Sequence, residues 1–239
     1  NEGIDATHSA EFTMLEAYQA YGDQTTIAGL IRDLYLGVAD ALGSRVVQTS
    51  RGEVDLGGPW RWLPVYDAVS DAVGEQVTVS TPLQTLRRYA ASRDVELDPS
   101  WGADKVVLEL LSELVEPHIL QPTFFCDYPA IAQPLARPHR SQPGLIEAWD
   151  LIIAGVERGT GFSELIDPVI QRQVLQAQSL LAAGGDPEAM ALDEDFLRAL
   201  EFGAPPMGGL GLGIDRLVML FTGASIRETI LFPLLKPED

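Results

Sequence analysis

The spacing of hydrophobic residues predicts alternating strands and helices along this chain. Residues 11–18 alternate at the period of two that a β-strand imposes, so that one face carries Phe12, Met14, Glu16 and Tyr18. Residues 25–42 instead place apolar side chains every three or four positions, which predicts an amphipathic helix. The same rules predict further helices at 65–73, 81–92, 101–115, 168–183, 193–202 and 217–222, and strands at 122–128, 151–153 and 157–165.

The predicted strands lie toward the two ends of the chain and bracket most of the helices. Residues 51–64 are rich in Gly, Pro and Trp and predict a loop or a short hairpin. The helices at about 65–115 follow one another without an intervening strand, which predicts a mainly helical insertion. Together these elements predict one α+β domain.

Alternate glycines precede an Asp-Arg pair in the segment GGLGLGIDRL at 208–217. In a strand, Gly209, Gly211 and Gly213 would form a strip without side chains, where a ligand can contact the backbone. The permanently charged, forked guanidinium of Arg216 would meet an anion at the end of that strip. A tight strand-to-helix turn with an internal Asp215–Arg216 ion pair would give the same pattern, so both interpretations stay open.

The amino-acid composition limits the kinds of ligand the protein is expected to bind and the cellular compartment in which it is expected to work. The 239 residues are 46% hydrophobic, enough for a sizeable core, and their formal charge of −19 repels nucleic-acid phosphate and favours a cationic small substrate. The single cysteine, Cys126, excludes a disulfide framework and suits a reducing compartment. The sequence has no signal peptide and no apolar run of the ~20 residues that span a membrane, so we expect a cytoplasmic location. The first residue is Asn1 rather than Met, which predicts a processed or excised piece.

Carboxylates occupy strand positions where an apolar side chain is expected. Glu16 shares a face with Tyr18, and Glu164 shares one with Phe162 and Thr160. Burying a carboxylate costs on the order of several kcal/mol unless a cation or a hydrogen-bond donor meets it. Two such carboxylates that converge would bind an ammonium group. The alternative is that each pairs with an internal Arg or Lys.

A second carboxylate pair, Asp150 and Glu157, flanks a predicted hairpin around Ala154 and Gly155. Carboxylates on neighbouring strands can share Mg²⁺, which prefers oxygen ligands and often binds nucleotide phosphates as well. From spacing alone, two solvated acids at the end of a strand are the better interpretation.

Several motifs, in order, resemble those of class II lysyl-tRNA synthetases. Asn1-Glu2-Gly3, His8 and EFTMLEAY at 11–18 resemble motif 2, and GLGLGIDR at 209–216 resembles motif 3. Between them QPTF at 121–124, YP at 128–129, PLAR at 134–137 and GFSEL at 161–165 stand in the order of the family, and LFP at 231–233 closes the domain. The resemblance covers residues 1–237. It implies a class II synthetase fold, a mainly antiparallel sheet flanked by helices.

One branch of the family is especially similar. The segments RPHRS at 137–141, WDL at 149–151, GGDPEAM at 184–190 and SIRET at 225–229 resemble the synthetase module of actinobacterial bifunctional proteins. Those proteins join a lysyl-tRNA synthetase to a membrane-embedded lysylphosphatidylglycerol synthase. The resemblance therefore implies a membrane-embedded lysyl-transferase half on the same full-length chain, and lysyl-tRNA that serves translation or lipid lysylation.

The resemblance implies a site for lysine, ATP and Mg²⁺, from which lysyl-adenylate forms before lysine moves to tRNA(Lys). The residues expected at ATP are Glu2 at the adenine edge, Phe12 on the ring, His8 near the triphosphate, Gly211 and Gly213 in the strip, and Arg216 at the γ-phosphate. Those expected at lysine are Glu16, Tyr18, Thr160, Phe162 and Glu164. Asp150 and Glu157 match the Mg²⁺ ligands. Catalysis would rest on Arg216 and Glu157, through positioning and charge neutralisation.

Departures from the family bear on activity. Thr7 stands where many members carry a phosphate-binding arginine, Thr160 replaces a common asparagine, and Asp150 replaces a glutamate. Residues 1–239 match a partial catalytic domain, from motif 2 to its C-terminal end, without motif 1, the anticodon-binding barrel and the motif 2 arginine that would precede Asn1. We therefore expect this piece alone to be inactive and the full-length protein to be a homodimer. Two alternatives stay open: a paralogue that lysylates a protein, and a non-catalytic lysine- or nucleotide-binding domain.

Overall fold

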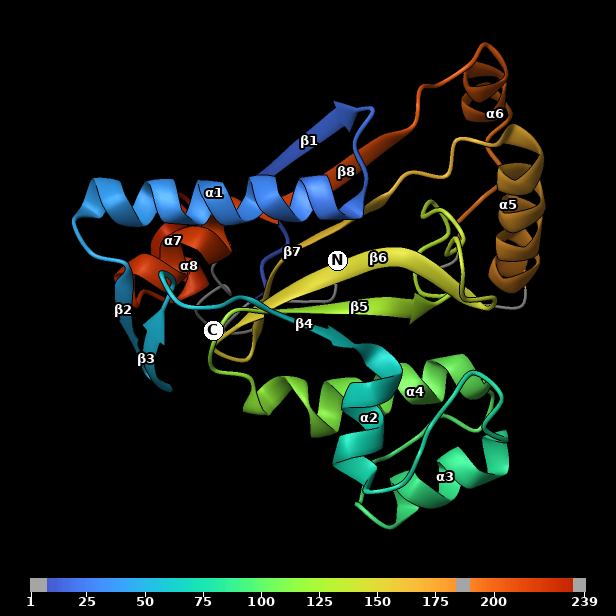
Figure 1. Ribbon diagram of the computed structural model, residues 1–239, viewed down its shortest axis with the longest axis horizontal. Helices are drawn as coiled ribbons and strands as arrows, with labels where there is room; N and C mark the ends of the chain where they lie inside the picture. The colour runs from blue at the N-terminus through green and yellow to red at the C-terminus, as the bar shows by residue number, and fades with distance from the viewer. Residues whose placement is uncertain (1–7, 184–189, 234–239) are drawn as a thin grey trace, which may run out of the picture.

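A six-stranded sheet organises the part of the chain that the computed structural model describes, residues 8–183 and 190–233 (Figure 1). Across the sheet the strands run in the order β1 (Met14–Ala20), β8 (Met207–Gly213), β7 (Val156–Ser163), β6 (Leu145–Ile153), β5 (Thr123–Pro129) and β4 (Arg61–Pro64). Neighbouring strands are antiparallel apart from β4 and β5. This confirms an α+β fold with a mainly antiparallel sheet, in which strands from the two ends of the chain pair.

Helices and one small hairpin complete the described fold. In chain order they are α1 (Gln24–Leu42), β2 (Val46–Thr49), β3 (Gly52–Asp55), α2 (Val65–Val73), α3 (Leu83–Ala91), α4 (Ala103–Leu114), η1 (Glu116–His118), α5 (Pro168–Ala183), α6 (Glu194–Glu201), α7 (Ile214–Thr222) and α8 (Ile226–Thr229). In the described part, no helix is long and apolar enough to cross a membrane.

One face of the sheet packs against α1 and α7. The side chain of Asp23 accepts hydrogen bonds from the first free N–H groups of α1, and Ile27 and Ile31 bury their whole side chains on the sheet. Helix and sheet approach very closely, since a Cβ at Gly208 would lie 2.6 Å from the carbonyl oxygen of Asp23 and one at Gly159 would lie 2.7 Å from Ile31. Glycine at both positions lets the helix pack directly on the backbone of the sheet.

The opposite face is covered only in part. Helices α2, α3 and α4 lie beneath β4, β5 and β6 in Figure 1 and share a core with Phe125, Ala148 and Ile152. The same face of β1, beyond them, is exposed: Met14 keeps 49% of its surface in solvent and Tyr18 keeps 61%. This part of the sheet is therefore the open surface on which a ligand can lie.

Three expectations from the sequence need correction. Glu16 is exposed rather than buried, because no helix in the described part covers that face of β1. Residues 61–64 form β4, where a loop or hairpin was expected, because their backbone pairs in parallel with β5. Helix α7 begins at Ile214, three residues earlier than expected. The expected end of α5 at Gly184 and Gly185 lies outside the described residues.

Candidate active site

The glycines of β8 form the floor of the open surface. Gly209 lies between Tyr18 on β1 and Phe162 on β7. Gly211 lies between Glu16 and Thr160 in the same way. Directly paired residues on neighbouring strands point to the same face of a sheet. The side chains of β1 and β7 therefore wall a strip whose floor is bare backbone, which confirms that the alternate glycines lie in a strand.

An acidic pocket stands at the Gly209 position of this strip. A Cβ on Gly209 would lie 2.0 Å from Oε1 of Glu164 and 2.8 Å from the ring of Tyr18, so both side chains lie directly over the glycine. The Tyr18 hydroxyl donates a 3.1 Å hydrogen bond to Glu16. Phe162 is half-buried and Thr160 lies two residues before it on β7. The structure thus brings together the five residues expected at lysine.

Glu164 is the electrostatically unusual member of the pocket. Its Oε1 is buried and accepts no hydrogen bond from any described residue. Burial, and then the neighbouring charge of Glu16, raises the pKa of the Glu164 carboxyl to about 7. An ammonium group that entered the pocket would form an ion pair with this carboxylate. The ion pair would offset the free-energy cost of burying its charge.

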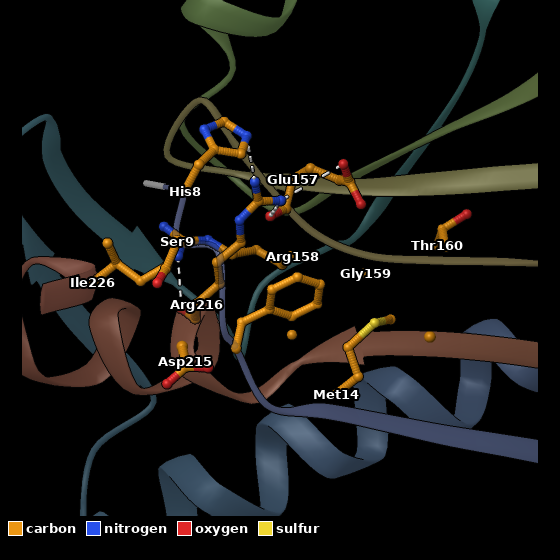
Figure 2. A pocket seen from close by; sticks show the side chains of 13 residues that line it. His8, Ser9, Met14, Glu157, Arg158, Gly159, Thr160, Asp215, Arg216 and Ile226 are labelled. Atoms are coloured by element: carbon orange, nitrogen blue, oxygen red, sulfur yellow. Dashed lines mark hydrogen bonds and ion pairs between the residues drawn. The ribbon is translucent and has the colours of Figure 1, made fainter. Parts of the chain in front are cut away.

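A basic group marks the other end of the strip. Arg216, on the first turn of α7, donates a 3.1 Å hydrogen bond to the carbonyl oxygen of Glu157 and lies 3.6 Å from its carboxylate. Its second amino group lies 3.1 Å from Nε2 of His8 (Figure 2). Phe12, half-exposed, and Gly213 line the same pocket. His8, Phe12, Gly211, Gly213 and Arg216 therefore surround one cavity, whereas Glu2 lies outside the described residues.

The internal Asp215–Arg216 ion pair, one of the two interpretations of the sequence, does not form in the described structure. Asp215 is 7% exposed, accepts a 2.7 Å hydrogen bond from the N–H of Thr13 and lies 3.3 Å from the hydroxyl of Thr229. Successive residues at the start of a helix point in directions about 100° apart, which separates the two side chains. Asp215 therefore anchors the segment before β1, while Arg216 faces the cavity.

A β-bulge brings Asp150 and Glu157 to the same face of the sheet. Asp150 pairs with Thr160 and Leu151 with Gly159, but Ile152 pairs with Glu157, which leaves Arg158 as the extra residue. Without that extra residue, Glu157 and Thr160 would point to opposite faces. The spacing of these residues in the sequence could not show that Glu157 and Thr160 point to the same face.

The two carboxylates present the oxygen ligands that Mg²⁺ prefers. Burial raises the pKa of Asp150, and the nearby charge of Glu116 adds to the shift. Burial, and then the charge of Glu157, raises the pKa of Glu116 to about 7. No group of three or more acidic, His or Cys side chains in the described ranges is arranged to hold a metal ion. Mg²⁺ needs no such cage, because it keeps waters and takes further oxygens from a bound nucleotide.

Two residues of this region were missed from the sequence. Glu116 lies in the short η1 helix, one residue beyond the helix expected at 101–115. Arg158 is 5% exposed and is among the residues that line the cavity beside Arg216 (Figure 2). Neither belongs to a motif in the sequence, and only folding brings them to the site.

Comparison with known proteins gives the family. The family described as tRNA synthetases class II (D, K and N) matches residues 1–236. The chain is 54% identical over 243 aligned residues to the lysylphosphatidylglycerol biosynthesis bifunctional protein LysX of Mycobacterium marinum, covering 99% of this chain and 22% of that protein. It is 51% identical to the protein of the same name from Mycobacterium leprae, covering 99% of this chain and 22% of the relative. The chain thus spans about a fifth of the length of these curated relatives.

Proposed function

This chain belongs to the class II tRNA synthetases of the D, K and N group, and we propose that it is the lysine-activating domain of a lysine–tRNA ligase. Enzymes of this family use an amino acid, ATP and a tRNA as substrates. The proposal adds the identity of the amino acid and the role of each side chain.

The observation that carries the proposal is the acidic pocket over Gly209. It presents a buried, unpartnered oxygen of Glu164 beside Tyr18 and Glu16. An ammonium group satisfies these acceptors, whereas an uncharged side chain leaves a buried carboxylate unpaired. A site built around such a charge therefore rejects uncharged amino acids by a large factor.

The proposed reaction needs no nucleophile from the protein. An oxygen of the lysine carboxylate attacks the α-phosphorus of ATP, the new C–O–P bond forms, and the bond to the β-phosphate oxygen breaks to release pyrophosphate. Arg216 binds the negative charge of the polyphosphate, with His8 beside it, and Phe12 stacks on the adenine. The 3′-terminal hydroxyl of tRNA(Lys) then attacks the lysyl carbonyl carbon, and AMP leaves.

Asp150 and Glu157 would hold Mg²⁺, which supplies charge neutralisation to the phosphates when it is bound. Asp150 forms no ion pair with a cation in the described structure, and burial disfavours its charged form. Glu157 is about half-exposed on the same face. Asp150, which is half-buried, and Glu157, which is more exposed, would together suit a Mg²⁺ ion that also binds the phosphates of the nucleotide.

The relatives favour a further use of the product. Their name describes bifunctional proteins of lysylphosphatidylglycerol biosynthesis. We therefore propose that the full-length protein passes lysyl-tRNA to a lipid-modifying half on the same chain and acts as a homodimer. The alternatives are a ligase that lysylates a protein, and a lysine or nucleotide sensor.

The test is lysine-dependent exchange between ATP and pyrophosphate in the full-length protein. Arg216→Ala should lower the exchange rate by about 10²–10³-fold, because one charge that stabilises the transition state is lost. Arg45→Ala serves as the matched control, since Arg45 pairs with Asp40 at an exposed end of α1. An unchanged rate in Arg216→Ala would favour the sensor. Transfer of radiolabelled lysine to a protein rather than to tRNA(Lys) would favour the paralogue.

A further inference from the structure

Arg158 is a buried cation without an acidic partner. It is 5% exposed, and among the described residues no carboxylate forms an ion pair with it. Burial, opposed by the nearby Tyr35 and reinforced by the charge of Arg216, lowers the pKa of its guanidinium to about 10. A buried charge of this kind is costly, so its hydrogen bonds should account for its presence.

Those hydrogen bonds join two parts of the candidate active site. Nε of Arg158 donates to the carbonyl oxygen of Ile153, the last residue of β6 before the hairpin turn, at 3.3 Å. Its NH1 group donates to the carbonyl oxygen of Arg216, on the first turn of α7, at 2.7 Å. The guanidinium therefore ties the β6–β7 hairpin to the helix that carries the phosphate-facing arginine.

The bulge explains why Arg158 can reach these groups. As the extra residue of β7, it leaves the regular alternation of the strand and lies near the fully buried Tyr35 of α1, while Glu157 shares the face of Asp150. The two arginines are linked through each other's strand and helix: the Arg216 side chain donates to the carbonyl oxygen of Glu157, and the Arg158 side chain donates to the carbonyl oxygen of Arg216. One hydrogen bond therefore holds the backbone of Arg216, and the other holds its guanidinium.

We propose that Arg158 is a positioning residue, which holds the first turn of α7 against the β6–β7 hairpin and so aims Arg216 at the polyphosphate. The proposal rests on the proposed function for the identity of the ligand. Its mechanism requires only that Arg216 bind a nucleotide polyphosphate.

The test uses the full-length protein and separates ATP from lysine. Arg158→Met keeps much of the side-chain length but removes the charge and the donors, and Arg158→Lys keeps the charge and one donor group. We expect Arg158→Met to weaken ATP binding, measured by calorimetry without lysine, by about tenfold, since small displacements of a positioned group cost rates and affinities of this order. In the exchange assay the KM for ATP should rise and kcat should fall, while the KM for lysine stays within about twofold. Arg158→Lys should recover part of the loss.

Arg93→Met is the matched control. Arg93 also joins two backbone segments, through the carbonyl oxygens of Val73 and Tyr89, but it lies in the helical insertion. It should lower the melting temperature without changing ATP binding. If Arg158→Met fails to fold, Arg158→Lys carries the test, because it preserves the buried charge.

A double-mutant cycle decides whether Arg158 acts through Arg216. In the Arg216→Ala background, Arg158→Met should weaken ATP binding by less than about twofold. An undiminished effect in that background, an equal rise in the KM for lysine, or unchanged ATP affinity in both Arg158 variants would each overturn the proposal. Absence of lysine-dependent exchange in the wild-type protein would instead defeat the proposed function, while ATP binding would still decide the role of Arg158.

Discussion

Lysine affinity should fall as Glu164 takes up a proton. In the protein without ligand, burial and then the charge of Glu16 raise the pKa of the Glu164 carboxyl from 4.5 to about 7. The charged carboxylate is the form that pairs with the lysine ammonium. Affinity should therefore be full above about pH 8, decline through pH 7, and fall about tenfold per unit below it, so that at pH 6 it is about tenfold weaker.

Protonation of Glu164 should have the opposite effect on the stability of the folded protein, which should rise as the carboxyl takes up a proton. Because the pKa of Glu164 is raised in the folded protein, the carboxylate disfavours folding at high pH, and that cost disappears as the pH falls from 7 toward 4.5. The shift corresponds to roughly 3 kcal/mol, and about 1–2 kcal/mol remains after allowance for the partial solvent exposure of the group. Glu164→Gln should therefore stabilise the ligand-free protein by that amount at pH 8. The same variant should weaken lysine binding by about 100-fold or more, because the ammonium loses its buried partner.

Calorimetric titration of lysine into the full-length protein between pH 5.5 and 8.5 measures the affinity, and thermal unfolding without lysine measures the stability. Glu16→Gln should move the midpoint of the affinity profile to lower pH, since it removes the like charge beside Glu164. Glu53→Gln, on the exposed hairpin strand β3, should leave the profile unchanged. A lysine affinity that stays constant from pH 6 to 8 in the wild-type protein would refute the reasoning.

Three further substitutions probe the two faces of the sheet: Gly209 lies on the ligand face, whereas Gly161 and Glu147 lie on the face that packs against α1. Gly209→Ala should raise the KM for lysine by about tenfold or more, with a smaller effect on the KM for ATP, because the added methyl group collides with Glu164. Steady-state kinetics of the exchange reaction measure both KM values. Gly161→Ala should destabilise the protein by about 1–3 kcal/mol in urea unfolding, because its Cβ would lie 2.4 Å from the fully buried indole of Trp149, and equal stability would contradict that contact. Glu147→Gln should lose about 3 kcal/mol of stability at pH 7, and the difference from wild type should vanish near pH 2. Burial opposes ionisation of Glu147, but hydrogen bonds from two arginines and a serine hold the pKa of its carboxyl at about 2. The stabilisation by Glu147 is therefore complete above pH 4.5 and lost below pH 2.

The strand pattern predicted which side chains share a face but not what covers that face. The period of two correctly placed Glu16 on the face of Tyr18. It also placed Glu164 on the face of Phe162, since Glu164 lies over Gly209, the residue that pairs with Phe162. It could not show that the helical insertion stops short of β1, so the burial expected for Glu16 is wrong. Burial depends on packing between distant segments, which a local pattern does not contain.

Local patterns also fail where the backbone leaves its regular period. Glu157 and Thr160 are three residues apart, which in an ideal strand puts them on opposite faces. The bulge at Arg158 reverses that parity and is encoded in the pairing with β6, not in β7 alone. The carboxylate pair was thus identified by family resemblance and hairpin position, whereas its shared face follows only from the fold. Strand β4 was missed for a related reason, since four residues show little periodicity.

Groups of opposite charge lie at the two ends of the strip along β8. Glu164 lies over Gly209, and Arg216 approaches the strip at Gly213, four residues further along. At about 3.3 Å per residue these two positions are about 13 Å apart. In the proposed reaction, an ammonium group at the first position and a polyphosphate at the second would leave the lysine carboxylate and the α-phosphate to meet between them, over Gly211. Glycine at that position would then serve the proposed chemistry as well as the fold, because the reacting atoms would occupy the space that a side chain would fill.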